Sequence, residues 1–174
     1  MDDLLDEESQ IANEQDSTKT LSSDIFEGPI SNLPQYKAIC LDESATLEEA
    51  IKTMQNKKIG SVLITNNGQL TGIITERDIL LKVTGVVTDL AAAKVRDYMT
   101  EDPQCLRSED MIAYVMNNMH VGGYRHVPIV DDNGIPLTVI SIKNVMTFIL
   151  DYFPEHITNI QGEPFRGPVS RESA

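Results

Sequence analysis

Two short stretches of the sequence carry side chains whose types and spacing could bind a ligand. Residues 72–78 read GIITERD, and residues 138–144 read TVISIKN. In each stretch a hydroxyl side chain follows an apolar run, and an Asp or Asn stands three positions further on. Because carboxylate and amide oxygens accept hydrogen bonds, such a pair could hold the vicinal hydroxyls of a ribose. That chemistry depends on the elements that position the two pairs.

The same side chains could instead serve the backbone of a following helix. A hydroxyl three residues before an acid or amide, at a strand-to-helix junction, is close to the capping-box pattern. Thr75 and Asp78 would cap one helix, and Ser141 and Asn144 would cap another. A helix N-terminus also attracts anions through its free N–H groups, so capping and ligand binding are compatible.

Both stretches belong to a longer internal repeat. Residues 37–64 align with residues 102–129 at an offset of 65, which places Cys40 on Cys105. Within the repeat, apolar residues recur at i, i+3, i+4 and i+7 in both copies, a spacing that defines one face of a helix. These residues are Leu47, Ala50, Ile51 and Met54 in the first copy, and Ile112, Val115, Met116 and Met119 in the second.

Each predicted helix is followed by two apolar runs with a polar turn between them. The runs are SVLIT and LTGIIT in the first half, and HVPIV and LTVIS in the second. Both turns contain Asn-Gly, which suits the positive φ angles of a tight hairpin. A second helix is expected to begin at about Glu76 and at about Ile142. The order strand, helix, strand, strand, helix favours an α/β fold, in which helices cover a sheet.

This pattern resembles a tandem of CBS domains, the Bateman module. The resemblance covers residues 25–155 and rests on the repeat, GIITERD, VRDYMTEDP and YRHVPIVDDNG. It implies an α/β fold, a pseudo-two-fold tandem of two β-α-β-β-α repeats packed as one module, with ligand clefts between them. The expected boundaries are a disordered acidic tail over 1–24, the first repeat with its linker over 25–90, the second repeat over 91–156, and an extended tail over 157–174.

The resemblance also implies a ligand. In Bateman modules this motif binds adenosine compounds, so Asp78 is expected to hold the ribose and Thr75 to lie near the phosphate. Ile39 and Gln104, at the starts of the first strands, are expected to contact the base. AMP, ADP or ATP is the expected ligand, with S-adenosylmethionine and NAD as alternatives. The expected nucleotide-binding residues are Ile39, Thr75, Arg77, Asp78, Gln104, Arg125, His126, Ser141, Lys143 and Asn144.

The second motif departs from the first at two positions. Gly72 would let a ligand ring approach the backbone, whereas Thr138 in its place adds bulk. Asn144 in place of Asp78 exchanges a charged acceptor for a neutral amide. Hydrogen bonds to charged groups contribute about 1.5–3 kcal/mol, against about 1 kcal/mol for neutral ones. We therefore expect the Asp78 site to be the tighter one and the Asn144 site to be weak or empty.

Arg125 and His126 stand where the first half has Gly60 and Ser61. One interpretation is ordinary: Arg125 is a surface residue and His126 closes the edge of a strand, and neither binds a ligand. The resemblance implies instead that basic residues here face phosphates, which an arginine can bind through two charge-assisted hydrogen bonds. His126 would then make binding depend on pH between about 5 and 8.

Composition and charge argue against several classes of function. The 174 residues carry a formal net charge of −13, which disfavours binding to the DNA or RNA backbone. No apolar run approaches the roughly 20 residues that span a bilayer, and the acidic N-terminus differs from a signal peptide. We therefore expect a cytoplasmic protein with no nucleic-acid or membrane partner.

The remaining residues suggest no catalysis. Two cysteines and three histidines form no metal-ligand pattern, and no nucleophile-and-base arrangement or Walker-type loop is present, so neither a metal site nor an enzyme is expected. The preferred interpretation is a stand-alone regulatory or sensor module that binds an adenine nucleotide. It would form a homodimer through the helices after each motif and regulate an unidentified protein. The alternative is a protein-interaction module with empty or degenerate clefts.

Overall fold

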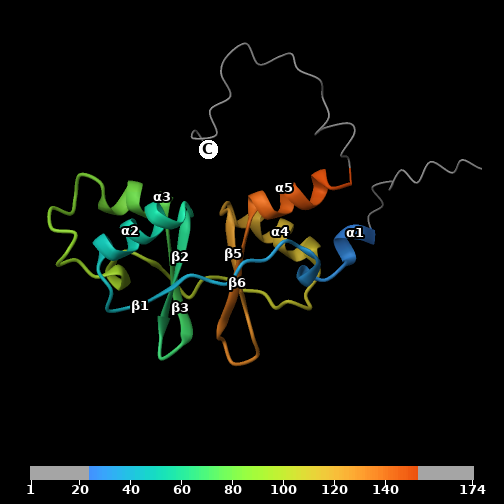
Figure 1. Cartoon of the computed structure of the whole chain (residues 1–174), viewed down its shortest axis with the longest axis horizontal. Coiled ribbons are helices and arrows are strands. Elements are labelled where there is room, and N and C mark those ends of the chain that lie inside the picture. The colour runs from blue at the N-terminus through green and yellow to red at the C-terminus, as the bar shows by residue number, and fades with distance from the viewer. Residues whose placement is uncertain (1–23, 153–174) are drawn as a thin grey trace, which may run out of the picture.

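A computed structural model describes residues 24–152 as two similar halves (Figure 1). The chain begins with α1 (Asp24–Glu27) and a 3₁₀ turn (Ile30–Asn32). The first half then contains β1 (Cys40–Asp42), α2 (Leu47–Lys57), β2 (Ser61–Asn66), β3 (Gln69–Thr75), α3 (Glu76–Asp78) and a π-helical turn (Ile79–Val83). A connection follows with a 3₁₀ turn (Val95–Asp97) and β4 (Thr100–Glu101). The second half contains α4 (Ile112–Gly122), β5 (His126–Val130), β6 (Pro136–Ser141) and α5 (Ile142–Leu150).

The two helices predicted from the apolar stripe are present, at equivalent positions. Leu47, Ala50 and Met54 of α2 are buried, as are their counterparts in α4, Ile112, Val115 and Met119. Burial of one face provides most of the stability of such short helices. Apart from the predicted tails over 1–24 and 157–174, which lie outside the described residues except for Asp24, the predicted fold is confirmed. None of the helices between residues 24 and 152 is long and apolar enough to cross a bilayer.

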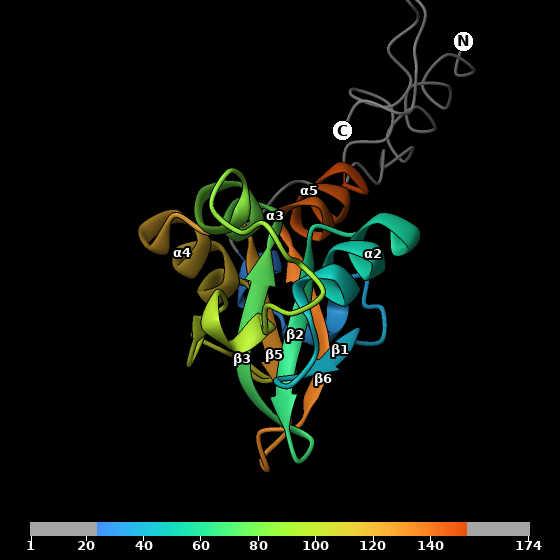
Figure 2. The same cartoon turned by 90° about the vertical axis from the view of Figure 1, so that its left-hand side faces the viewer.

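The strands form a mixed sheet in the first half and a hairpin in the second. The larger sheet has the order β1-β2-β3-β4, with β1 parallel to β2 and the other neighbours antiparallel. β5 and β6 pair antiparallel. The two hairpin turns meet at the end of the molecule opposite the helices, where the Leu70 N–H donates to the Gly134 carbonyl over 2.9 Å (Figure 2).

The first strand predicted for the second half is reduced to a single bridge. Leu106 pairs with Ile129 in the parallel sense, as Leu41 pairs with Ile64 in the first half. Position 128 explains the difference. Leu63 of β2 donates its N–H to the Ile39 carbonyl over 3.0 Å, but the equivalent residue of β5 is Pro128, which has no N–H to donate.

Each half is completed by a segment that precedes the other half. Ile30 and Leu33 lie in the core of the second half, and Val95 lies in the core of the first. The backbone contacts repeat in the same way. The Ile30 N–H donates to the Asp110 carbonyl over 2.8 Å, and the Val95 N–H donates to the Ala45 carbonyl over 2.9 Å. The blue N-terminal segment accordingly lies beside α4 in Figure 1. The exchange of segments packs the halves as one module.

Candidate functional site

A cavity of about 590 Å³ lies between the two halves and contains the first of the two motifs. The motif contributes the side chains from Thr75 to Asp78, and the second half contributes those from Tyr124 to His126 together with Gln104. Six of the ten expected nucleotide-binding residues therefore line one cavity. They are Thr75, Arg77, Asp78, Gln104, Arg125 and His126.

Thr75 and Asp78 form a capping box at the start of α3, as the spacing indicated. The Asp78 N–H donates to the Thr75 hydroxyl over 3.2 Å. In return, Asp78 Oδ2 accepts hydrogen bonds from the Thr75 N–H at 3.0 Å and from the Thr75 hydroxyl at 2.6 Å. The Asp side chain is thus long enough to close the box. The turn places the carboxylate on the wall of the cavity, with only 8% of the residue exposed.

The second oxygen of Asp78 has polar partners of its own. Asp78 Oδ1 lies 2.8 Å from the Lys82 ammonium and accepts a hydrogen bond from the Thr100 hydroxyl at 3.4 Å. Burial alone would raise the pKa of the Asp78 carboxyl. Hydrogen bonds from Lys82 and Thr75 and the positive charge of Lys82 outweigh burial and hold the pKa below its usual value. The carboxylate is therefore ionised at neutral pH.

His126 and Glu76 approach each other where the two halves meet. A Cβ added at Gly60 would lie 3.2 Å from the Glu76 carboxylate and 3.3 Å from the His126 ring, so glycine allows both side chains to crowd this point. Burial lowers the pKa of His126 and Arg125 lowers it further, while Glu76 raises it by a smaller amount. The net effect is a pKa below the usual value, which favours the neutral imidazole.

Two further hydrogen bonds shape the cavity: one joins the first motif to the second half, and the other lies within the wall that faces the motif. Arg77 Nη1 donates to the Gly123 carbonyl over 3.4 Å. On the opposite wall the Tyr124 hydroxyl donates to Gln104 Oε1 over 2.7 Å. A Cβ at Gly122 would overlap the Tyr124 ring, so this ring position requires glycine in α4. Tyr124 was not among the predicted site residues, although its place directly before Arg125 could have indicated it.

The family follows from comparison with known proteins. A model of the CBS domain matches residues 30–89 and again residues 95–151. The chain belongs to the CBS-domain family. The resemblance predicted from the repeat is thereby confirmed, and the match assigns one CBS repeat to each half.

Individual relatives are distant and of different lengths. The chain is 26% identical over 129 residues to the CBS domain-containing protein CBSCBSPB3 of Arabidopsis thaliana, a match covering 73% of this chain but 23% of that protein. It is 30% identical over 123 residues to a 17.7 kDa protein of Acidianus ambivalens, covering 70% and 73% of the two chains. A CBS domain protein from Pyrobaculum aerophilum, solved in complex with AMP, has a TM-score of 0.62 at 24% identity, covering 72% of this chain and 98% of that one.

The second CBS motif lies outside the cavity, and its polar groups contact the segment that leads into β1. Ser141 and Asn144 form the same capping box, with the Ser141 N–H donating to Asn144 Oδ1 over 2.8 Å. The Asn144 amide nitrogen donates to the Pro34 carbonyl at 3.1 Å, and the Thr138 hydroxyl donates to the Tyr36 carbonyl at 2.6 Å. Thr138, Ser141 and Asn144 of this motif therefore already have partners within the chain.

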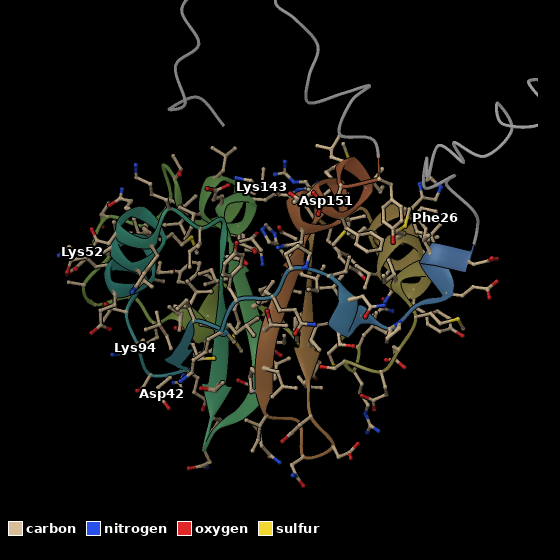
Figure 3. All side chains as sticks on the ribbon, turned by 45° about the vertical axis from the view of Figure 1, so that its right-hand side comes forward. Phe26, Asp42, Lys52, Lys94, Lys143 and Asp151 are labelled. Carbon is tan, nitrogen blue, oxygen red and sulfur yellow. The ribbon has the colours of Figure 1, made fainter. Side chains whose placement is uncertain are left out.

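The other two expected residues also lie away from the cavity. Ile39 packs against the core of the first repeat, and Lys143 projects from the start of α5 at the helical end of the module (Figure 3). Thus Ile39, Ser141, Lys143 and Asn144 are not gathered around the first motif. Among residues 24–152, no group of three or more His, Cys, Asp or Glu side chains is placed to hold a metal ion.

Proposed function

We propose that this CBS pair is a regulatory module that binds an adenine nucleotide in the cavity between its repeats. The observation that carries the proposal is the composition of the cavity, which combines the buried Asp78 carboxylate and the half-buried Thr75 hydroxyl with two arginines and a histidine. A ribose diol would be held by Asp78, and phosphate by Arg125 and Arg77. Gln104 and Tyr124 would face the base.

The AMP complex of the Pyrobaculum aerophilum protein supports this choice of ligand class. AMP, ADP and ATP share the groups that the cavity would recognise, and S-adenosylmethionine and NAD share the adenosine part. We propose AMP, ADP or ATP because Arg77 and Arg125 add positive charge beyond the ribose-binding pair. Ser141, Lys143, Asn144 and Ile39 would form a second, weaker site only if the Pro34 and Tyr36 contacts opened.

The deciding experiment is calorimetric titration of the full chain with AMP, ADP and ATP. We expect a micromolar dissociation constant, about −8 kcal/mol, for at least one of them. Asp78→Asn should weaken that affinity at least about five-fold, because a neutral acceptor replaces a charged one. Glu49→Gln is the matched control, since Glu49 closes the capping box of α2 but does not line the cavity.

Absence of binding at millimolar nucleotide, by folded and ligand-free protein, would favour the alternative of a protein-interaction module. Equal weakening by Asp78→Asn and Glu49→Gln would instead show that the cavity is not the binding site.

We further propose that the module forms a homodimer through the helices that follow the two motifs. Leu80, Leu81, Ile142 and Met146 are 66%, 66%, 41% and 49% exposed. Leu80 and Leu81 lie in the π-helical turn that continues α3, and Ile142 and Met146 lie in α5. Figures 1 and 2 both place α3 and α5 at the same end of the molecule, so these apolar side chains belong to helical segments at one end. Such a dimer in the cytoplasm could bind a regulated protein differently with and without nucleotide in the cavity.

A further inference from the structure

The Asp78 carboxylate has no acceptor position left for a ligand. An ionised carboxylate offers about four lone-pair positions on its two oxygens. Oδ2 accepts from the N–H and the hydroxyl of Thr75, and Oδ1 accepts from Lys82 and Thr100. A ribose hydroxyl can therefore bind Asp78 only by displacing one of these donors.

The Lys82 ammonium is equally well occupied. It lies four residues after Asp78, in the π-helical turn, and its three N–H groups have three acceptors. Besides Asp78 Oδ1 at 2.8 Å, these are the carbonyls of Tyr98 at 2.9 Å and Met99 at 3.2 Å. Lys82 thus joins the motif carboxylate to the connection between the 3₁₀ turn at Val95–Asp97 and β4.

The second repeat makes the same link without a lysine. The position equivalent to Lys82 is Phe148, whose side chain is buried in the core. There the Asn144 amide itself donates to the carbonyl of Pro34, the residue equivalent to Met99 at the repeat offset of 65. The Asp78 carboxylate cannot donate a hydrogen bond to a carbonyl. In the first repeat the Lys82 ammonium therefore lies between Asp78 and the carbonyls of Tyr98 and Met99.

The four donors to Asp78 differ in how readily they can leave. The two from Thr75 also cap α3, and losing a cap costs about 1 kcal/mol. Thr100 is the most distant at 3.4 Å. The Lys82 side chain is 42% exposed, so its ammonium can turn into water, where it is well solvated. Lys82 and Thr100 are therefore the groups that a ligand would displace.

We propose that Lys82 is a built-in competitor for Asp78, which sets the affinity of the cavity and is released when ligand hydroxyls take its place. This inference rests on the proposed binding of an adenine nucleotide. Its consequence is that the carbonyls of Tyr98 and Met99 lose their cation when the cavity fills. Because β4 begins at Thr100 and pairs with β3, ligand binding at the motif changes the contacts of the connection between the two halves.

The affinity test compares Lys82→Met with wild type, using adenosine as the ligand, because adenosine has the diol but no phosphate charge. We expect Lys82→Met to bind adenosine about two- to five-fold more tightly, since one competing, partly exposed ion pair is removed. 2′,3′-Dideoxyadenosine, which lacks both hydroxyls, should bind the two proteins equally. Lys52→Met is the matched control, because Lys52 makes an i, i+4 ion pair with Glu48 at the outer edge of α2 (Figure 3).

Weaker or unchanged adenosine binding by Lys82→Met would overturn the proposal. An equal gain for dideoxyadenosine would also overturn it, because the effect would then be independent of the hydroxyls. If wild type binds none of AMP, ADP, ATP and adenosine, the proposed function itself fails, and competition by Lys82 fails with it.

Amide hydrogen exchange separates the link to the backbone from ligand binding. In ligand-free protein, Lys82→Met should raise exchange in residues 98–101, and Lys52→Met should leave it unchanged. Adenosine should raise exchange in the same residues of wild type but not of Lys82→Met. The contrary result is that Lys82→Met shows faster exchange without ligand and yet binds adenosine as wild type does. That result would make Lys82 a structural link only and would refute its role as a competitor.

Discussion

At the scale of single residues, Asp78 serves both the helix and the cavity, and the second repeat shows how the two can be separated. Asn144 closes a capping box with Ser141 at 2.8 and 2.6 Å, distances close to those that Asp78 makes with Thr75. An amide oxygen therefore suffices for the cap. The negative charge of Asp78 is needed only by its other partners, Lys82 and a ligand.

Asp78→Ala and Asp78→Asn should accordingly differ in stability. We expect alanine to lower the free energy of unfolding by about 1–2 kcal/mol, because both the cap and the Lys82 contact are lost. Asparagine should lower it by less than about 1 kcal/mol, because the cap survives and a partly exposed ion pair contributes little. Urea denaturation followed by circular dichroism would measure both. Equal losses would show that the cap depends on the charge.

His126 should make stability depend on pH. Its folded-state pKa lies below the usual value of 6.5, so between these two values the unfolded chain binds more protons than the folded one. The free energy of unfolding should therefore fall as the pH is lowered through 6.5 toward the folded-state pKa. Urea midpoints at pH 8 and pH 5.5 would measure this loss, and His126→Gln should reduce it. An unchanged difference in His126→Gln would assign the pH dependence to other groups.

The capping contacts of the motif could be predicted from the sequence, whereas the contacts with distant segments could not. Thr75 and Asp78 are three positions apart, so their spacing alone predicts the capping box. Lys82 stands at i+4 from Asp78 and was within reach of the same kind of argument. The contact between Asn144 and Pro34 joins residues 110 positions apart, and no local pattern indicates it.

At the scale of elements, Gly72 in β3 makes room for the connection that leads to β4. Gly72 does not line the cavity. A Cβ at this position would overlap the Met99 side chain, which packs against β3 just before β4 begins. The Met99 side chain therefore occupies the space beside Gly72 in this structure, and the approach of a ligand ring there stays a prediction.

A double-mutant cycle tests this contact. Gly72→Ala should destabilise the protein by about 1–3 kcal/mol through overpacking, and Met99→Ala should cost about 1–2 kcal/mol because Met99 is only partly buried. The double variant should be more stable than the sum predicts by at least about 1 kcal/mol, since the new methyl group fills part of the vacated space. Denaturant unfolding would measure all three, and simple additivity would contradict the proposed contact.

Strand pairing was predicted correctly where the pattern was local. The Asn-Gly turns predicted both hairpins, and Asn67 and Gly68 have the expected positive φ angles of 51° and 85°. The lost strand near Cys105 was also encoded, by Pro128, but its effect depends on knowing which carbonyl faces position 128. That pairing joins segments more than twenty residues apart, so it followed only from the fold.

At the scale of the whole molecule, the exchange of segments makes the repeats interdependent. Ile30 precedes β1 of the first half yet is fully buried in the core of the second half, and Val95, its equivalent, is fully buried in the core of the first half. The cavity also takes its walls from both repeats. A nucleotide in the cavity would therefore contact two cores that already share their flanking segments.

This arrangement predicts that the module unfolds as one unit. Ile30→Ala and Val95→Ala each remove buried methyl groups, and we expect losses of about 2–4 kcal/mol and about 1–3 kcal/mol in the free energy of unfolding. Because each core is completed by a segment tied to the other repeat, both variants should shift the same single transition. Urea unfolding followed by circular dichroism and by tyrosine fluorescence would test this. Two separated transitions, each moved by only one of the substitutions, would show that the repeats unfold independently. Coupling between them would then require bound nucleotide, and the connection at residues 98–101 would not be enough to transmit occupancy.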